Sequence, residues 1–244
     1  MEHGIILVRP ETSGNIGAVC RAMATAGLKD LSIVGEKHRY NEDEILKFAL
    51  KAYSIWEHAH FFAPQIDGLR TALSKYSFAC GTTRRTGKKR TSSIQTIAQC
   101  ARSIGEQHIR NAAFVFGNER TGLMREELAL CNMSVYIPTS NDFGSLNLSH
   151  AVQLVCYELF LQSNNMANGS GGTDSEQVTL EEVFRTSENI ISFLKLRGFF
   201  KVGGAQENEQ FFNTILAKAN LNPFELSHIN QIVKKLLAKE HKEQ

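Results

Sequence analysis

The chain has 244 residues, of which 42% are hydrophobic and 21% are charged. These values exclude a collagen-like or wholly disordered chain, and they are ordinary for a globular protein with one large domain or a domain and a small appendage. Lys and Arg number 27 and Asp and Glu 25, so the net charge of +2 lacks the strongly basic balance that would by itself indicate nucleic-acid binding.

The five cysteines are odd in number and widely spaced, and no C-x-x-C pair occurs. Most lie among apolar residues, which predicts buried, reduced thiols. The first residues show no basic segment followed by a long apolar one, and no apolar run approaches the roughly 20 residues that span a bilayer. We therefore expect a cytoplasmic protein without a signal peptide or a membrane partner.

Short apolar segments alternate with helical patterns through the first two-thirds of the chain. The patterns predict strands at 4–8, 31–34, 77–80, 112–116 and 134–137, and helices at 15–26, 44–57, 94–107, 125–131 and 146–161. Strands of four or five mostly apolar residues, separated by helices, indicate a parallel sheet with helices on both faces. Residues 1–162 are therefore expected to form an α/β domain.

The composition changes after this domain. Residues 163–178 are rich in Gly, Asn and Ser and lack a hydrophobic period, which predicts a flexible linker. Thr179 and Glu182 then form a capping-box pattern that opens a helix, and two more helical patterns follow near 207–219 and 223–239. We expect residues 179–244 to be a small all-α extension, which at about 65 residues is marginal alone and should dock on another surface.

Patterns typical of nucleotide-binding loops and metal sites are incomplete. The glycines at 14–17 do not form G-x-G-x-x-G, and the segment 81–89 has five residues between its glycines where a P-loop has four. Lys89 also stands where a P-loop needs Ser or Thr. His58 and His60 lack the further ligands that a metal site needs, so we expect no metal.

The strongest electrostatic feature follows the strand predicted at 77–80. Residues 84–90 contain five cations and no acid, namely Arg84, Arg85, Lys88, Lys89 and Arg90. Such a loop lies at the carboxyl edge of a parallel sheet, where α/β proteins bind ligands, and its cations could neutralise phosphates. The alternative is a solvated loop without a binding role.

Three other segments combine glycine with polar residues near strand ends, and all three should meet at the same sheet edge. They are Asn15 to Arg21, Phe116 to Leu123, and Ile137 to Ser149. Turn chemistry could explain each alone, and Asn15 and Asn147 could serve only as helix N-caps. In this order, however, the motifs N-x-G-x-x-x-R, F-G-N-E-x-x-G-L and I-P-…-S-L-N-L-S resemble those of the SpoU-type RNA ribose 2′-O-methyltransferases of the SPOUT superfamily, over about residues 4–162.

The resemblance implies a deep trefoil knot in the last part of the α/β domain, S-adenosylmethionine as the methyl donor, and a homodimer formed through knot-region helices. The opening segment and the helical tail are most similar to the TrmJ branch, which methylates a pyrimidine ribose at position 32 in the tRNA anticodon loop. We therefore expect 2′-O-methylation of tRNA. Methylation of rRNA and a catalytically silent RNA-binding knot protein are the alternatives.

The resemblance also assigns roles to individual residues. The catalytic group would be Arg21, Asn15, Glu119, Ser145 and Asn147. The donor would contact Thr82, Thr83, Arg84, Gly117, Ile137, Gly144, Ser145 and Leu146, with Gly117 allowing the backbone to approach the adenosine. RNA would contact Arg9, Arg21, Arg84, Arg85, Lys88, Lys89 and Arg90. Because an arginine stays protonated in proteins, we expect Arg21 to bind a phosphate and polarise the 2′-hydroxyl rather than act as a general base. Glu119 could instead pair with Arg21 or Arg120.

Neutralising Arg85, Lys88 and Lys89 together should weaken RNA binding and reduce its salt dependence, by roughly one unit of slope for each lost phosphate contact. Filter binding of RNA over a salt series measures both quantities. An unchanged affinity and slope would show that the basic run is only a solvated loop.

Overall fold

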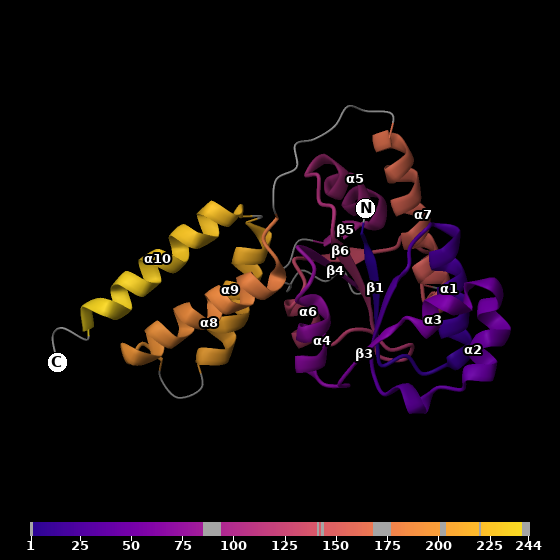
Figure 1. Cartoon of the computed structure of the whole chain (residues 1–244), viewed down its shortest axis with the longest axis horizontal. Helices are drawn as coiled ribbons and strands as arrows, with labels where there is room; N and C mark the ends of the chain where they lie inside the picture. Colours follow the sequence, from indigo (N-terminus) through magenta and orange to yellow (C-terminus); the bar gives the residue numbers. More distant parts are fainter. Residues whose placement is uncertain are drawn as a thin grey trace.

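Among the residues that the structure describes, seven parallel strands form one sheet (Figure 1). The computed structural model describes residues 2–84, 94–140, 142, 144–167, 177–200, 204–219 and 221–240. The strands are β1 (Gly4–Val8), β2 (Asp30–Val34), β3 (His60–Phe62), β4 (Phe78–Thr82), β5 (Ile94–Thr96), β6 (Ala112–Phe116) and β7 (Met133–Tyr136). Their order across the sheet is β3-β2-β1-β6-β4-β7-β5, so β1, β6, β4 and β7 lie side by side.

Helices cover both faces of the sheet, which confirms the predicted α/β class. One face carries α1 (Ser13–Thr25), α2 (Glu42–Ala49), α3 (Tyr53–Glu57), α5 (Ile97–Glu106) and α7 (Leu148–Ala167). The other face carries α4 (Ile66–Leu73) and α6 (Arg125–Ala129), and its core continues into α8 (Leu180–Leu196), α9 (Ala205–Lys218) and α10 (Pro223–Glu240), of which α10 packs on α8. Successive residues of a strand point to opposite faces, so Ile5 and Leu7 join the first core while Ile6 and Val8 join the second.

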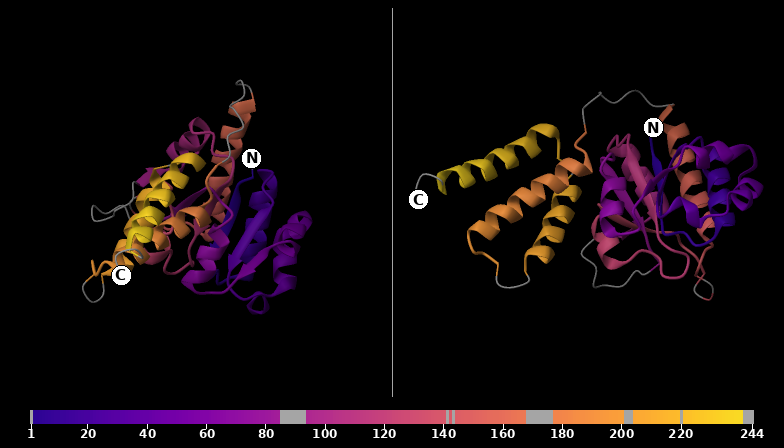
Figure 2. Two further views of the ribbon diagram at one scale, coloured as in Figure 1. Left: turned by 60° about the vertical axis from the view of Figure 1, so that its left-hand side comes forward. Right: turned by 60° about the horizontal axis from the view of Figure 1, so that its bottom comes forward.

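The helical tail docks on the side of the α/β domain that carries α4 and α6, and Figure 2 shows α8, α9 and α10 grouped beside that domain. Leu180 at the start of α8 donates its main-chain N–H to the carbonyl of Tyr76 at 2.7 Å. The buried Asn132 links the tail to the sheet, because its Nδ2 donates to the carbonyl of Ala217 in α9 at 2.7 Å and its Oδ1 accepts from the N–H of Ala79 in β4 at 2.8 Å. The tail therefore completes the second core of the protein.

An arginine fixes the same interface from α4. Arg70 pairs with Glu188 of α8 at 2.6 Å and with Glu209 of α9 at 3.5 Å, and its guanidinium lies 4.9 Å from the ring centroid of Phe184. These contacts place α4 in the surface on which the tail docks.

Several elements differ from the sequence prediction. The helix predicted at 44–57 is interrupted, because Leu50 adopts φ 53° and a short 3₁₀ turn, Leu50–Ala52, separates α2 from α3. The segment 94–96 is a strand rather than the start of a helix, since Thr96 is the N-cap of α5 and forms a capping box with Gln99. β3 and α4 were not predicted. α7 continues to Ala167, five residues into the predicted linker, and 168–176 lie outside the described residues.

All five cysteines are free and buried, as predicted. Burial raises the pKa of Cys20, Cys131 and Cys156 to about 12, which keeps these thiols protonated and unreactive. No helix within the described ranges is both long and apolar enough to cross a membrane.

Asn132→Ala should lower the free energy of unfolding by about 3 kcal/mol, because it leaves the buried N–H of Ala79 and the buried carbonyl of Ala217 without this partner. Urea denaturation followed by circular dichroism measures the change. Asn189→Ala is the matched control, since its half-buried amide donates only at 3.3 Å to Asn230 and should cost under about 1 kcal/mol. Equal losses in the two variants would contradict a docking role for Asn132.

Candidate functional site

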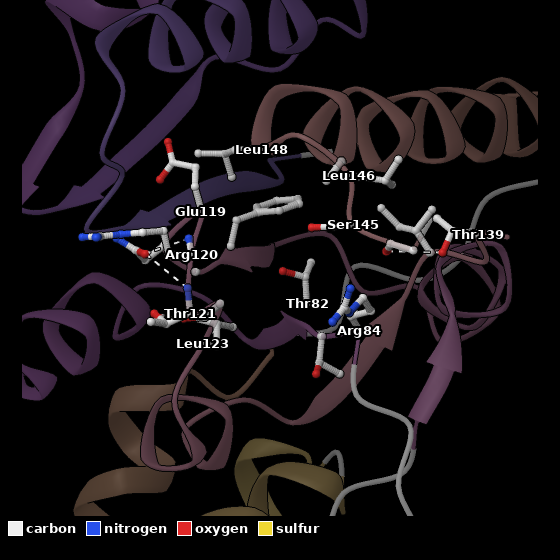
Figure 3. A pocket seen from close by; sticks show the side chains of 18 of the residues that line it. Thr82, Arg84, Glu119, Arg120, Thr121, Leu123, Thr139, Ser145, Leu146 and Leu148 are labelled. Carbon is white, nitrogen blue, oxygen red and sulfur yellow. Dashed lines mark hydrogen bonds between the residues drawn. The ribbon is translucent and has the colours of Figure 1, made fainter. Parts of the chain in front are cut away.

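Loops that are distant in the sequence meet at the carboxyl edge of the sheet. β1, β6, β4 and β7 are neighbours and parallel, so the segments that follow them emerge side by side. These segments contain the three motifs and the start of the basic run. Figure 3 shows Thr82 and Arg84, at and just after the end of β4, and Ser145, which comes after β7, around one space.

The carboxylate of Glu119 connects the β6 loop to the start of α1. One oxygen accepts the main-chain N–H of Glu11 at 2.8 Å. The other accepts the N–H of Thr12 at 3.2 Å and Nδ2 of Asn15 at 3.0 Å. Glu119 therefore receives three N–H donors from the β1–α1 segment, and among the described contacts it is not paired with Arg21 or Arg120.

Asn147 extends this network to the β7 loop. Its Nδ2 donates to Oδ1 of Asn15 at 2.9 Å, and its own Oδ1 accepts the N–H of Ser149 at 2.8 Å. The second contact is that of a helix N-cap, so Asn147 caps α7 in addition to its contact with Asn15. The capping interpretation is wrong for Asn15, which lies inside α1, because the N-cap of that helix is Thr12. Glu119, Asn15 and Asn147 thus form one hydrogen-bonded chain.

A pocket of about 230 Å³ opens beside this chain. All eight residues expected to contact the donor line it, namely Thr82, Thr83, Arg84, Gly117, Ile137, Gly144, Ser145 and Leu146. Glu119, expected in the catalytic group, also lines it. The sequence assigned no role to the other lining residues, which are Phe116, Asn118, Arg120, Thr121, Gly122, Leu123, Val135, Thr139, Leu148 and Ala151. Most of these lie within the two later motifs or directly beside them, so the motif boundaries are the signal that could have found them.

The turn itself requires a glycine at position 117. A Cβ at this position would lie 2.1 Å from the carbonyl carbon of Gly122 and 2.2 Å from the nitrogen of Leu123. Oδ1 of Asn118 accepts the N–H groups of Arg120 and Thr121 at 2.9 and 3.3 Å, which closes the turn. The close approach of its own loop therefore already requires glycine at position 117, and the expected approach of this backbone to the adenosine stays a prediction.

Glu11 adds a second carboxylate at the rim. Its Oε1 accepts from Nδ2 of Asn118 at 2.8 Å and from Nε of Arg120 at 2.7 Å. These hydrogen bonds lower the pKa of Glu11 and favour its charged form. Two carboxylates consequently join the segments after β1 and β6. Glu119 of the β6 loop accepts donors from the β1–α1 segment, and Glu11 of that segment accepts donors from the β6 loop.

The predicted RNA-binding cations have different environments. Arg84 is exposed and lines the pocket. Arg9 forms an ion pair with the buried Glu127. Arg21 is exposed on α1 and does not line the pocket. Arg85, Lys88, Lys89 and Arg90 lie outside the described residues.

One residue near the site gave no sequence signal. Burial raises the pKa of Tyr40 to about 12, and the charges that act on its hydroxyl include those of Arg39 and Glu119. Tyr40 also packs edge-on against Trp56, with ring centroids 6.0 Å apart. The segment after β2 therefore lies beside the Glu119 network. In the described part of the chain, no group of three or more His, Cys, Asp or Glu side chains could hold a metal.

Comparison with known proteins identifies the fold and motifs. A model of the SpoU rRNA methylase family matches residues 2–157. The chain belongs to the SpoU rRNA methylase family. Its sequence is 35% identical over 189 residues to the tRNA (cytidine/uridine-2′-O-)-methyltransferase TrmJ of Photorhabdus laumondii, which covers 78% of this chain and 74% of that protein. It is 33% identical over 226 residues to an uncharacterized tRNA/rRNA methyltransferase of Haemophilus influenzae, with 89% of each chain covered.

A solved structure of a relative extends the similarity to the tail. The crystal structure of TrmJ from Z. mobilis ZM4 has a TM-score of 0.79 and 28% identity, and the match covers 96% of this chain and 98% of that one. The SpoU family model, in contrast, ends at residue 157. Membership of the SpoU family implies the trefoil knot expected from the motifs, and here β7 lies between β4 and β5 in the sheet before the chain enters α7.

Proposed function

We propose that this protein transfers a methyl group from S-adenosylmethionine to a ribose 2′-hydroxyl of tRNA. The observation that carries the proposal is that all eight residues expected to contact the donor line one pocket. The relative from P. laumondii, whose name states this reaction, supports the tRNA substrate. We propose that the methylated nucleotide is the pyrimidine at position 32 of the anticodon loop. The proposed domains are a catalytic domain (1–162), a linker (163–178) and a helical extension (179–244). We propose that the protein acts in the cytoplasm.

The lining of the pocket suits this donor. Leu123, Ile137 and Leu148 offer apolar surface for an adenine ring, while Thr139 and Ser145 offer hydroxyls for the polar end of the molecule. When bound, the donor supplies an activated methyl group on a sulfonium. The pocket residues bind and orient it, and no metal is needed for this chemistry.

The reaction is a single displacement. The carbon–oxygen bond forms as the carbon–sulfur bond breaks, S-adenosylhomocysteine leaves as a neutral thioether, and the proton of the hydroxyl passes to a phosphate of the RNA or to water. Holding the hydroxyl in line with the methyl group supplies much of the acceleration. We assign this task to Asn15, Glu119, Ser145 and Asn147, because three of them form one hydrogen-bonded chain beside the pocket.

Arg21 would bind the phosphate next to the target ribose and polarise the 2′-hydroxyl. Arg21→Ala should lower turnover by at least about a hundredfold, since a lost donor to the 2′-hydroxyl acts on the transition state. Most of the tRNA affinity should be retained, because one phosphate contact is a small part of the binding. Tritium transfer from labelled donor to unmodified tRNA measures turnover, and filter binding measures affinity. Arg102→Ala is the matched control, because Arg102 is an exposed arginine on α5 away from the pocket.

The same assay decides between the alternatives. Mapping the methylated nucleotide in tRNA tests position 32. Methylation of rRNA in place of tRNA would show that the substrate is rRNA. Donor binding, measured first by calorimetry, guards against an inactive preparation. Donor binding without transfer to either RNA would show a catalytically silent RNA-binding protein.

We also propose that the protein is a homodimer formed through knot-region helices, with residues of both protomers in each site. α7 buries Val152, Val155 and Leu159 in the core. Its opposite side exposes Leu154, Tyr157 and Leu161, which are 41%, 52% and 40% accessible and recur at helical spacing. Such an apolar stripe supports an interface with a second copy.

Tyr157→Glu should convert the dimer to a monomer, because it places a charge in the apolar stripe, and it should leave the fold intact since Tyr157 is 52% exposed. Sedimentation equilibrium at micromolar concentration measures the mass. Ile232→Glu is the matched control on α10, where the side chain is 48% exposed. A wild-type chain that sediments as a stable 27.2 kDa monomer would contradict the proposal.

A further inference from the structure

Arg9 has a main-chain conformation that most residues avoid. It directly follows β1 with φ 50°, in the left-handed region where side chains other than glycine are disfavoured. Its N–H donates to the carbonyl of Val34 at 2.9 Å, and its carbonyl accepts Nδ2 of Asn118 at 3.0 Å. The main chain at Arg9 is therefore held from both sides in a strained turn.

The side chain of Arg9 is half-buried and reaches α6. One guanidinium nitrogen pairs with Oε1 of Glu127, and another donates to the carbonyl of Pro64 at 3.5 Å. The side chain of Glu127 is only 4% exposed, and its second oxygen accepts the N–H of Met124 at 2.8 Å. A carboxylate this well buried needs its cation, because an unpaired buried charge is strongly destabilising.

The turn that begins at Arg9 supplies the donors that hold the catalytic network. Two and three residues further on, the N–H groups of Glu11 and Thr12 bind the carboxylate of Glu119. Glu119 in turn holds Asn15, which holds Asn147. A shift of the turn would move the whole chain of side chains beside the pocket.

We infer that Arg9 and Glu127 are positioning residues for methyl transfer. Their ion pair fixes the turn at residues 9–12 so that Glu119, Asn15 and Asn147 keep the geometry that the reaction needs. This role rests on the proposed function. It replaces the expectation that Arg9 binds RNA, because the Arg9 guanidinium is committed to a carboxylate of its own chain.

The two roles predict different kinetics. If Arg9 and Glu127 position the network, Arg9→Ala and Glu127→Gln should each lower kcat by about 10- to 100-fold, the range that a small misplacement of reacting groups produces. KM for tRNA and the salt dependence of tRNA binding should stay the same. Arg9→Lys keeps the charge and should restore most of kcat. Because both single variants break one interaction, the double variant should lose little more than Arg9→Ala alone.

Arg125→Ala is the control, since Arg125 is an exposed arginine two residues from Glu127 on the same helix. Thermal unfolding of each variant separates loss of fold from loss of positioning. The inference is overturned if kcat is unchanged in the Arg9 and Glu127 variants. It is also overturned if Arg9→Ala raises KM for tRNA and lowers the salt slope by about one while Glu127→Gln does neither, which is the pattern of a phosphate contact.

A second measurement tests the positioning role independently of the proposed function. If the wild-type protein methylates no RNA, amide hydrogen exchange at Glu11 and Thr12 still tests the positioning role. Arg9→Ala should speed exchange of both amides at least about tenfold, as expected when a turn opens locally, and Arg125→Ala should not. Unchanged exchange in Arg9→Ala would overturn the inference whatever the substrate is.

Discussion

The carboxylate of Glu119 is the group on which the geometry of the site depends. It accepts three N–H donors from a segment more than 100 residues earlier in the chain, at the point where β1 ends. Hydrogen bonds to a charged acceptor are about twice as strong as neutral ones, so this single group fixes the β6 loop against α1. Asn15 then carries the constraint to Asn147 and the start of α7. The loops after β1, β6 and β7 consequently behave as one unit.

The helical tail is also connected to the turn after β1, through α6. α9 lies on α6 and receives a hydrogen bond from Asn132, while Glu127 of α6 holds Arg9. Apolar side chains of α8 and α9 join the second core beside those of α4 and α6. Burial of these side chains stabilises the tail and the α/β part of the chain together, because residues of both parts make up the second core.

The sequence predicts this fold well where local patterns and tertiary structure agree. The strand at 4–8 is buried throughout and is central in the sheet, so its apolar run carried the full signal. Leu50 shows the opposite case, since its left-handed conformation breaks a helix that the hydrophobic period continues. Motif order located the pocket residues. It could not locate Tyr40 or the partner of Arg9, because contacts over long sequence distances leave no local pattern.

Arg9 also shows why formal charge is a poor measure of RNA affinity. Binding to a phosphate gains free energy by releasing counterions, and this gain requires a cation that is not already neutralised. Arg9 pairs with Glu127 and Arg120 pairs with Glu11, so each would have to leave a carboxylate of its own chain before it could bind RNA. The exposed Arg84 at the pocket rim bears no such described pair. The near-neutral net charge of +2 therefore says little about this edge of the sheet, because it does not distinguish the cations that the fold pairs from those that it leaves facing solvent.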